Sequence, residues 1–473
     1  MKYVSTRGPG PRIGFADVLL AGLARDGGLY VPEKFPRLSP GDIRDLQGRS
    51  YADIARRVMH PFVAGAIPKA AFAQLVADTY AGFDHAAVAP LKQIGADRWL
   101  MELFHGPTLA FKDYALQLVG RLFDRVLAER GERMAIVGAT SGDTGAAAIE
   151  ACRGRARMRI FILHPRGRVS DVQRRQMTTV ADANVHNIAI EGTFDDCQAL
   201  VKAMFNDHAF RDRHRLAAVN SINWARIMAQ VAYYFAAGAA LGAPERKISF
   251  AVPTGNFGNV YAGYVAGRMG LPIARLFVGS NRNDILTRYL ATGVMATAKV
   301  VPTTSPSMDI QVSSNFERLL FEAWNRKSAP LADAMTAFAR TGRADFGRER
   351  WGRITRQFAG FRLDDKGTAR VIRDVHRSCG EILDPHSAIG LAAGAALHRP
   401  DDGALVALAT AHPAKFPDAV EAACGVRPAL PARLADLYDR RERCATLPND
   451  LARLKAFVAA RAPINDETSR KRP

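Results

Sequence analysis

The amino-acid sequence predicts an α/β fold with mostly parallel sheets. From about residue 96, short apolar runs alternate with segments that carry the apolar spacing of helices. The alternation occurs twice, before and after a long helical pattern at 223–241. Strands that alternate with helices are typical of parallel sheets, because each parallel connection needs a crossover. The 473 residues are enough for two or three domains with sizeable cores.

The elements are expected in the following order. Residues 1–95 are mostly helical, with Pro- and Gly-rich joints at 8–11 and 32–36. The first alternating region has strands at 99–104, 133–137, 158–163 and 185–190, and helices at 114–130, 142–152, 171–179 and 194–205. The second has strands at 248–252, 273–278 and 404–409, with several helices between the last two. We therefore expect a helical extension (1–95), a smaller α/β domain (96–240), a larger one (241–430), and a C-terminal helical segment with its tail (431–473).

Composition argues against several classes of protein. The five cysteines are scattered and form no CxxC pair, and the eleven histidines show no HExxH spacing, so we expect neither a disulfide framework nor a metal site. No apolar run is long enough for a membrane span, and the first residues lack the apolar region of a signal peptide. We expect a cytoplasmic protein that does not bind a membrane.

The formal charge of +19 raises the possibility of nucleic-acid binding. The charge is spread along the chain, mostly as arginine, and no finger or RNP signature accompanies it. The short basic cluster Ser469–Pro473 is more typical of a solvated end. We expect no nucleic-acid partner, and we expect the positive charge to attract phosphorylated small molecules.

Lys112 lies at an unusual place, between a predicted strand and the helix that follows it. A cation near a helix N-terminus opposes the helix dipole, whereas a neutral amine that must bond a carbonyl suits this position. A lysine that extends to solvent is the alternative.

A glycine-rich turn, Pro253-Thr-Gly-Asn-Phe-Gly-Asn259, follows a predicted strand and opens a helix. Its two glycines let the backbone approach an anion, and the helix N-terminus adds partial positive charge. No P-loop lysine is present, so a fixed cofactor phosphate suits this turn better than a transferred one. An ordinary strand-to-helix turn is the alternative.

Three further segments have a similar context. Ala139-Thr-Ser-Gly-Asp-Thr-Gly145 can hold a carboxylate or small oxyanion, or can simply cap a helix. Asn220-Ser-Ile-Asn-Trp-Ala-Arg226 opens the long helix, with Asn220 and Ser221 at the expected cap and Arg226 a turn further in. A capped helix with a surface arginine is the alternative. Thr410 follows the last predicted strand and presents an uncharged hydroxyl to the ligand crevice, or is a buried turn residue.

Together these segments supply the parts of a pyridoxal-phosphate site. Such a site needs a lysine that forms a Schiff base, a phosphate cup, a place for the carboxylate of an amino acid and a partner for the ring nitrogen.

The same segments, in the same order, resemble the threonine synthase family, its longer bacterial and fungal branch especially. The resemblance rests on 104–113, 139–145, 253–259 and 410–416, with Tyr3–Gly8 and Asp384–Ile389 in support. It spans nearly the whole chain. It implies a pyridoxal-phosphate enzyme of fold type II, the tryptophan-synthase-β type, with two doubly wound α/β domains and a mostly helical N-terminal extension.

The resemblance also implies roles for residues. Lys112 would be the Schiff-base lysine in the smaller α/β domain, Thr410 would face the pyridine nitrogen, and Asp143 would lie near the 3-hydroxyl of the cofactor. The cofactor phosphate would be held in the larger α/β domain by Gly255, Asn256, Phe257, Gly258 and Asn259. The substrate carboxylate would be held by Thr140, Ser141 and Thr144, and the substrate phosphate by Asn220, Ser221 and Arg226.

The activity that the resemblance implies is that of a lyase in the last step of threonine biosynthesis. It converts O-phospho-L-homoserine and water to L-threonine and phosphate by γ-elimination and β-hydration. A monomer or homodimer is expected. Alternatives are a threonine or serine dehydratase, a lyase that ends at 2-oxobutyrate, and a basic scaffolding or nucleic-acid-binding protein. Dehydratases typically carry a polyglycine phosphate loop, which Thr254–Gly258 is not.

Overall fold

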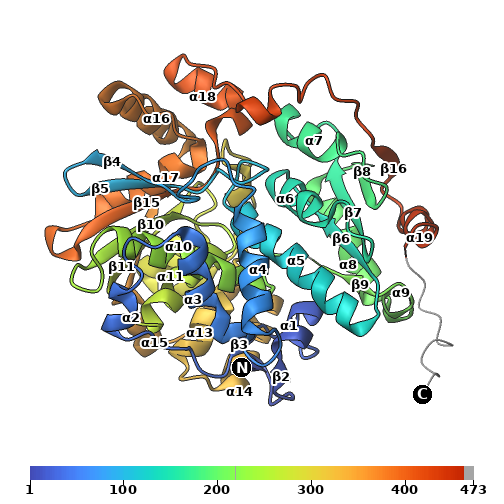
Figure 1. Cartoon of the computed structure of the whole chain (residues 1–473), viewed down its shortest axis with the longest axis horizontal. Coiled ribbons are helices and arrows are strands. Elements are labelled where there is room, and N and C mark those ends of the chain that lie inside the picture. Colours follow the sequence, from blue (N-terminus) through green and yellow to red (C-terminus); the bar gives the residue numbers. More distant parts are fainter. Residues whose placement is uncertain (219, 463–473) are drawn as a thin grey trace. The chain divides into compact units, whose positions relative to one another are not determined.

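The computed structural model describes residues 1–218 and 220–462. It divides into two compact units, one of residues 1–115 and 221–429 and the other of 116–220 together with the C-terminal segment from 430. Figure 1 shows that each unit has a central sheet with helices packed on it. The basic cluster Ser469–Pro473 lies outside the described residues.

The first unit is built on a six-stranded sheet of order β14-β11-β10-β15-β5-β4. Four of its five strand pairs are parallel, and only β4 and β5 pair in antiparallel fashion. Its strands are β4 (Leu91–Gly95), β5 (Arg98–Glu102), β10 (Ile248–Pro253), β11 (Ile273–Ser280), β14 (Phe358–Arg362) and β15 (Ala404–Ala409). β10 and β15 are buried along their whole length and, apart from Ser249, are apolar on both faces, as expected for central parallel strands.

Helices of the first unit connect and cover these strands. The helix α17 (Pro385–Leu397) packs against β10, β11, β14 and β15 and contributes Ala388, Leu391 and Ala393 to the core. The other helices after residue 220 are α10 (Trp224–Ala240), α11 (Gly258–Arg268), α12 (Ile285–Thr292), α13 (Phe316–Ala323), α14 (Ser328–Thr341), α15 (Arg348–Thr355), α16 (Asp365–Cys379) and α18 (Pro417–Cys424). The strands β12 (Val294–Ala296) and β13 (Arg343–Asp345) form a separate two-stranded antiparallel sheet.

The N-terminal segment is helical, as expected, and also holds a small antiparallel sheet that the sequence pattern did not reveal. The helices are α1 (Phe15–Ala21), α2 (Pro40–Arg44), α3 (Tyr51–Val63) and α4 (Lys69–Tyr80). The sheet has the order β2-β1-β3, with strands Ile13–Gly14, Lys2–Ser5 and Tyr30–Pro32. Tyr3 is fully buried in β1 and packs near Trp224 of α10. The segment is therefore an integral part of the first unit.

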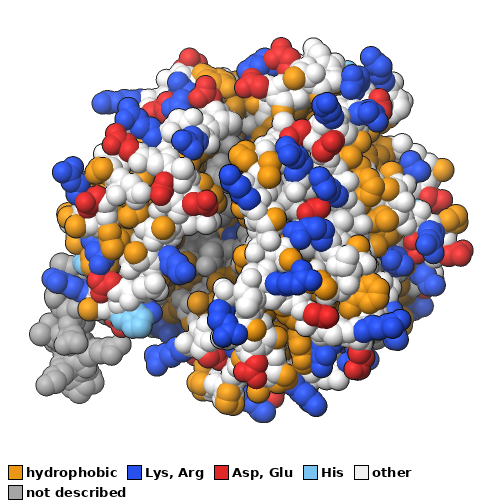
Figure 2. Space-filling model, turned by 180° about the vertical axis from the view of Figure 1, so that it is seen from behind, with side chains coloured by type: hydrophobic (Ala, Val, Ile, Leu, Met, Phe, Trp, Pro, Cys, Tyr) orange, Lys and Arg blue, Asp and Glu red, His pale blue; other side chains and the backbone are white. Residues whose placement is uncertain are grey.

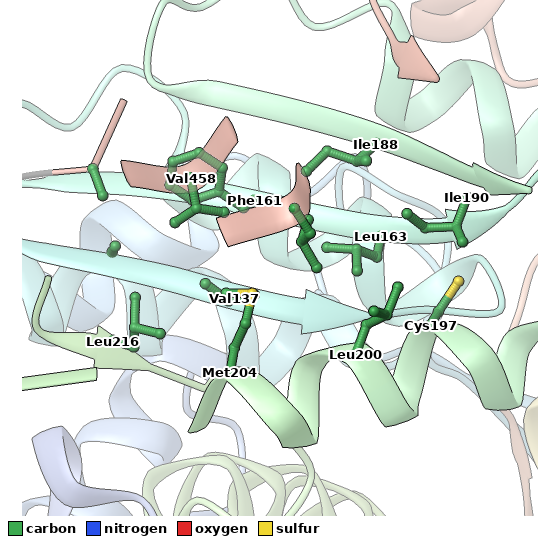
Figure 3. Packing of buried hydrophobic residues seen from close by; sticks show 13 residues of the cluster. Val137, Phe161, Leu163, Ile188, Ile190, Cys197, Leu200, Met204, Leu216 and Val458 are labelled. Carbon is green, nitrogen blue, oxygen red and sulfur yellow. The ribbon is translucent and has the colours of Figure 1, made fainter. Parts of the chain in front are cut away.

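The second unit has a five-stranded, fully parallel sheet of order β16-β8-β7-β6-β9. Its strands are β6 (Met134–Ala139), β7 (Met158–Pro165), β8 (Val185–Glu191), β9 (Leu216–Ala217) and β16 (Ala445–Pro448). Its helices are α6 (Asp143–Cys152), α7 (Asp171–Thr178), α8 (Phe194–Asn206), α9 (His208–Arg213) and α19 (Leu451–Ala459), together with most of α5 (Lys112–Arg130). Figure 3 shows Val137, Phe161 and Leu163 of the sheet packed with Leu200 and Met204 of α8.

The α/β class with two doubly wound α/β domains is confirmed, and two further details differ from expectation. The stretch after Leu430 was expected to be helical, but β16 forms within it and pairs with β8. Its four residues, Ala-Thr-Leu-Pro, are too few to show a strand period. The compact units are also discontinuous in sequence, and β5 and Lys112 belong to the first of them. The fourfold division at 95, 240 and 430 stays a prediction.

Within the part of the chain that the structure describes, no helix combines the length and the apolar character needed to cross a bilayer.

Candidate active site

Lys112 is the first residue of α5, and its side chain is buried. Its Nζ atom lies 3.4 Å from the hydroxyl oxygen of Ser307 and 5.1 Å from the ring centroid of Phe111. The alternative of a lysine that extends to solvent is therefore wrong. A buried amine at the start of a helix has the setting expected for a nucleophilic lysine.

Thr410 is held beside the lysine by backbone pairing. The carbonyl oxygen of Thr410 accepts a hydrogen bond of 2.8 Å from the amide of Phe111, and Ala110 and Ala411 form an isolated antiparallel bridge. Thr410 directly follows β15 and is 4% exposed. Its hydroxyl has no hydrogen-bond partner among the described residues, so it is available to a ligand.

Ser307 connects Lys112 to the glycine-rich turn. Its hydroxyl faces Lys112, and its carbonyl oxygen would lie 2.7 Å from a Cβ atom placed on Gly255. Only glycine therefore fits at position 255 without a shift of the backbone. Lys112, Thr410 and the turn after β10 are thus neighbours within the first unit.

The turn presents unsatisfied donors. Within the described structure, the backbone amides of Gly255, Asn256, Phe257 and Gly258 donate to no protein group. Phe257 is in the left-handed region with φ = 62°, which is uncommon for a non-glycine residue. Consecutive free amides at the start of α11 are what an anion such as a phosphate needs.

Asn259 is buried in the first turn of α11 and is fixed by two tyrosines. Its side-chain oxygen accepts a hydrogen bond of 2.5 Å from Tyr233, and the Tyr234 hydroxyl donates to its carbonyl oxygen at 2.9 Å. The Nδ2 atom of Asn259 has no partner in the described structure. The tyrosines therefore orient an amide donor that remains free.

Asp384 organises the surroundings of both Thr410 and Ser307. It caps α17 and accepts hydrogen bonds from the amides of His386 and Ser387 and from both of their side chains. The Ser387 hydroxyl in turn accepts the amide of Thr410 at 2.9 Å, and His386 Nε2 accepts the amide of Ser307 at 3.3 Å. One buried carboxylate thus sets the position of both residues.

Arg226 lies in the first turn of α10 and is 4% exposed. Its Nε and Nη1 atoms have no hydrogen-bond partner among the described residues. Burial lowers the pKa of this guanidinium to about 10. The alternative of a surface arginine is therefore wrong. A buried, charged guanidinium without a protein partner is suited to bind an anion.

The expected cap of α10 needs a correction. The side chain of Asn223, not that of Asn220 or Ser221, accepts the hydrogen bond that caps the helix, from the amide of Ala225 at 3.0 Å. Asn223 also donates to the carbonyl of Leu19 at 2.8 Å, and this tertiary contact favours the later start. Ser221 instead accepts a hydrogen bond on its carbonyl oxygen from Asn315, while Asn220 is exposed.

The loop before α6 belongs to the second unit. Thr140 accepts the amides of Gly142 and Gly145 on its hydroxyl oxygen at 3.0 and 2.8 Å, so it supports the start of the helix. The hydroxyls of Ser141 and Thr144 have no hydrogen-bond partner among the described residues. Asp143 is buried and accepts a hydrogen bond of 2.8 Å from Gln173. The loop combines a fixed carboxylate with free hydroxyls.

Comparisons with known proteins cover almost the whole chain. Three family models match it: "Threonine synthase N terminus" at residues 2–80, "Pyridoxal-phosphate dependent enzyme" at 85–344 and "Threonine synthase, C-terminal" at 387–458. A threonine synthase of Pseudomonas aeruginosa is 55% identical over 97% of this chain and 98% of its own length.

The chain belongs to the threonine synthase family.

Solved structures of threonine synthases agree with this placement. A pyridoxal-phosphate-bound threonine synthase from Brucella melitensis is 54% identical, covers 98% of this chain and 99% of its own, and superposes with a TM-score of 0.96. The yeast threonine synthase is 37% identical, covers 97% and 98%, and has a TM-score of 0.92. The expected family, fold type II, pyridoxal-phosphate dependence and lyase class are confirmed.

The residues of this threonine synthase family member fit the cofactor. A phosphate needs several converging donors, and the free amides of the Gly255–Gly258 turn supply them. The turn is linked through Ser307 to the buried amine of Lys112. The sequence did not single out Ser307, Ser313 or Asn315. Their only signal was a stretch rich in hydroxyls and amides, 303–315. Asp384 and His386 lie in a segment that carried the resemblance but had no assigned role.

Proposed function

We propose that this chain converts O-phospho-L-homoserine and water to L-threonine and phosphate, as the last step of threonine biosynthesis. The family supports the reaction class. The observation that supports a phosphorylated substrate is Arg226. Arg226 is a buried cation with unpartnered nitrogens one turn into α10, close in sequence to Asn220 and Ser221. A leaving phosphate gains charge as its bond to Cγ breaks, and a fixed cation favours that change.

The proposed roles follow the site. Lys112 forms the Schiff base, Thr410 faces the ring nitrogen as a neutral partner, and Asp143 lies near the 3-hydroxyl. The amides of Gly255–Asn259 hold the cofactor phosphate, and Thr140, Ser141 and Thr144 take the substrate carboxylate. When bound, pyridoxal phosphate withdraws electrons from the α-carbon of the amino acid joined to it.

Lys112 then carries the protons. Its amine removes the proton from Cα and next a proton from Cβ, so that phosphate can leave Cγ. A proton then returns to Cγ, water adds at Cβ, and a final proton returned to Cα completes L-threonine. One amine that serves several steps must be shielded from bulk water, and its burial supports this role.

The deciding experiment adds O-phosphohomoserine to the purified holoenzyme and measures phosphate, threonine and 2-oxobutyrate together. We expect equal amounts of phosphate and threonine. Phosphate with 2-oxobutyrate instead of threonine would identify the competing lyase, which differs in how water reaches Cβ. Keto acid from threonine or serine would favour a dehydratase.

Replacement of Lys112 is the matching residue test. Lys112→Ala should abolish turnover and the covalent attachment of cofactor after borohydride reduction, since the alanine has no amine. Intact-mass measurement before and after reduction gives the second readout. Turnover retained in Lys112→Ala would move the catalytic amine elsewhere, for example to the buried Lys415.

We also propose a cytoplasmic protein that is a monomer or homodimer and binds neither nucleic acid nor a membrane. Lys and Arg side chains are scattered among Asp and Glu over the face in Figure 2, in agreement with the spread of charge in the sequence. Light scattering after size-exclusion chromatography measures the oligomeric state, and a gel-shift titration with duplex DNA tests the nucleic-acid alternative.

A further inference from the structure

The segment before α13 holds the carbonyl groups of the glycine-rich turn. The Ser313 hydroxyl donates to the carbonyl oxygen of Gly255 at 2.7 Å. Asn315 donates to the carbonyl oxygen of Asn256 twice, from its backbone amide at 3.1 Å and from its side-chain Nδ2 at 2.9 Å. Two consecutive carbonyls of the turn are therefore fixed by one short segment of the first unit.

The directions of these two carbonyls set the directions of the amides that follow them in the chain. In a trans peptide the C=O of one residue and the N–H of the next point in opposite directions. The cis bond found among the described residues is Ala243–Pro244, so the turn is trans. Because the carbonyls of Gly255 and Asn256 face Ser313 and Asn315, the amides of Asn256 and Phe257 face the other way, where neither has a protein partner.

We propose that Ser313 and Asn315 are positioning residues that aim the amides of Asn256 and Phe257 at the phosphate of pyridoxal phosphate. They act through the backbone of the turn. Phe257 is in the left-handed region at φ = 62°, a conformation that costs energy for a phenylalanine. The hydrogen bonds from Asn315 help to maintain it.

Asn315 reaches a second turn as well. Its Nδ2 atom donates to the carbonyl oxygen of Ser221 at 3.1 Å, and its Oδ1 atom accepts from the buried guanidinium of Arg318. Asn315 stands at the cap position of α13, yet its side chain caps no amide of that helix. The side chain instead joins two turns. The Asn256 turn is proposed to hold the cofactor phosphate, and the Ser221 turn is proposed to hold the substrate phosphate.

The two residues should therefore have separable effects. Of the two turns, the side chain of Ser313 bonds to the cofactor turn, whereas the side chain of Asn315 bonds to both. Loss of Ser313 should weaken the cofactor phosphate site alone. Loss of Asn315 should weaken that site and also phosphate binding at Ser221 and Arg226. This inference rests on the proposed placement of the cofactor phosphate at the Gly255–Asn259 turn.

The test compares pyridoxal phosphate with pyridoxal, which lacks the phosphate, in titrations of the apoenzyme followed by absorbance. Ser313→Ala should weaken the affinity of the apoenzyme for pyridoxal phosphate roughly five- to twentyfold. This is the effect expected when a preorganised donor loses one supporting hydrogen bond. Pyridoxal binding should change less than about twofold. Ser313→Thr keeps the hydroxyl and should restore the affinity, which a purely structural role of this position would not require.

Asn315→Ala is titrated in the same way, and the holoenzyme is also titrated with inorganic phosphate. Asn315→Ala should weaken the binding of both pyridoxal phosphate and inorganic phosphate. Ser313→Ala should leave the binding of inorganic phosphate unchanged. Equal weakening of pyridoxal and pyridoxal phosphate, or no change for either in Ser313→Ala, would overturn the inference. If Asn315→Ala does not fold, the comparison of Ser313→Ala with Ser313→Thr still tests the inference.

Gly255→Ala separates this inference from the proposed site. Its new Cβ would meet the carbonyl oxygen of Ser307 at 2.7 Å and displace the turn directly. One outcome is that Gly255→Ala loses affinity for pyridoxal phosphate but not for pyridoxal, while Ser313→Ala shows no such difference. In that case the turn holds the phosphate without help from Ser313. If Gly255→Ala also fails to discriminate, the phosphate lies elsewhere and the proposed site itself is wrong.

Discussion

Arg226 and Arg318 are both buried arginines of the first unit, and burial lowers the pKa of each guanidinium to about 10. Their surroundings differ. Arg318 donates to the carbonyl oxygens of Tyr30 and Ile222 and to Asn315, whereas Nε and Nη1 of Arg226 have no partner in the described structure. Arg318 therefore stabilises the fold, whereas the unpartnered nitrogens of Arg226 support its proposed role in binding an anion.

Replacement of each arginine by methionine should give opposite results. Arg226→Met should lower kcat/KM for O-phosphohomoserine by about 2–4 kcal/mol of transition-state stabilisation. Its thermal stability should be unchanged or higher, because an unpaired buried charge is removed. Arg318→Met should lose roughly 2–4 kcal/mol of unfolding free energy, since buried carbonyls lose their donor. Calorimetry and steady-state kinetics measure the two effects.

The contribution of Arg226 to folding stability depends on pH with a definite sign. Its folded pKa of about 10 lies below the ordinary value of a guanidinium, so the desolvation cost is fully present below pH 10 and is relieved as pH rises above 10. Near neutral pH the group is charged and able to bind phosphate. An unchanged kcat/KM together with a large drop in stability in Arg226→Met would show that the arginine is structural.

At the scale of elements, β8 carries a half-buried histidine that packs against the core of the second unit. The ring of His186 stacks on Phe161 with centroids 4.8 Å apart, and its Nε2 atom is buried without a partner. Burial, followed by the nearby charges of Arg461, Arg159 and Arg443, lowers the pKa of His186 to about 4. The neutral ring is thus built into this strand.

Acid should therefore destabilise the second unit through His186. Between pH 6.5 and about 4 the unfolded chain binds a proton that the folded chain does not, so stability falls as pH falls through this window. Because the ring is only half-buried, solvent screens part of this contribution, which is on the order of 1–2 kcal/mol. His186→Phe should reduce the loss of thermal stability between pH 7 and pH 4.5, measured by calorimetry. His208→Phe, at an exposed position in α9, is the control and should not. Parallel pH profiles of wild type and His186→Phe would contradict this.

At the scale of the whole molecule, the net charge of +19 predicts a dependence on salt. A positive protein raises the local concentration of an anionic substrate, and salt screens this attraction over about 10 Å at 0.1 M. The kcat/KM for O-phosphohomoserine should fall several-fold, on the order of two to five, between low and physiological salt. The affinity of the apoenzyme for neutral pyridoxal is the control and should hardly change. A salt-independent kcat/KM would mean that the charge has no role in substrate capture.

Much of the fold was predictable because its signals are local. The strands β10, β11 and β15 and the helices α6 and α8 were expected within a few residues of their bounds, since apolar runs and helical spacing are written along the chain. The glycine-rich turn and the position of Lys112 were found in the same way. Short elements such as β9 and β16, and the N-terminal sheet, give no period to detect.

The sequence by itself determined the parallel α/β class, the family and the segments that carry the chemistry, because these depend on neighbouring residues. Only the tertiary structure decided which segments meet. The pairing of β5 with β15 brings Lys112 beside Thr410, and the segment before α13 brings Asn315 to two turns. It also buried Arg226 and shifted the cap of α10 to Asn223. Such contacts join residues far apart in the chain, and no local pattern encodes their register.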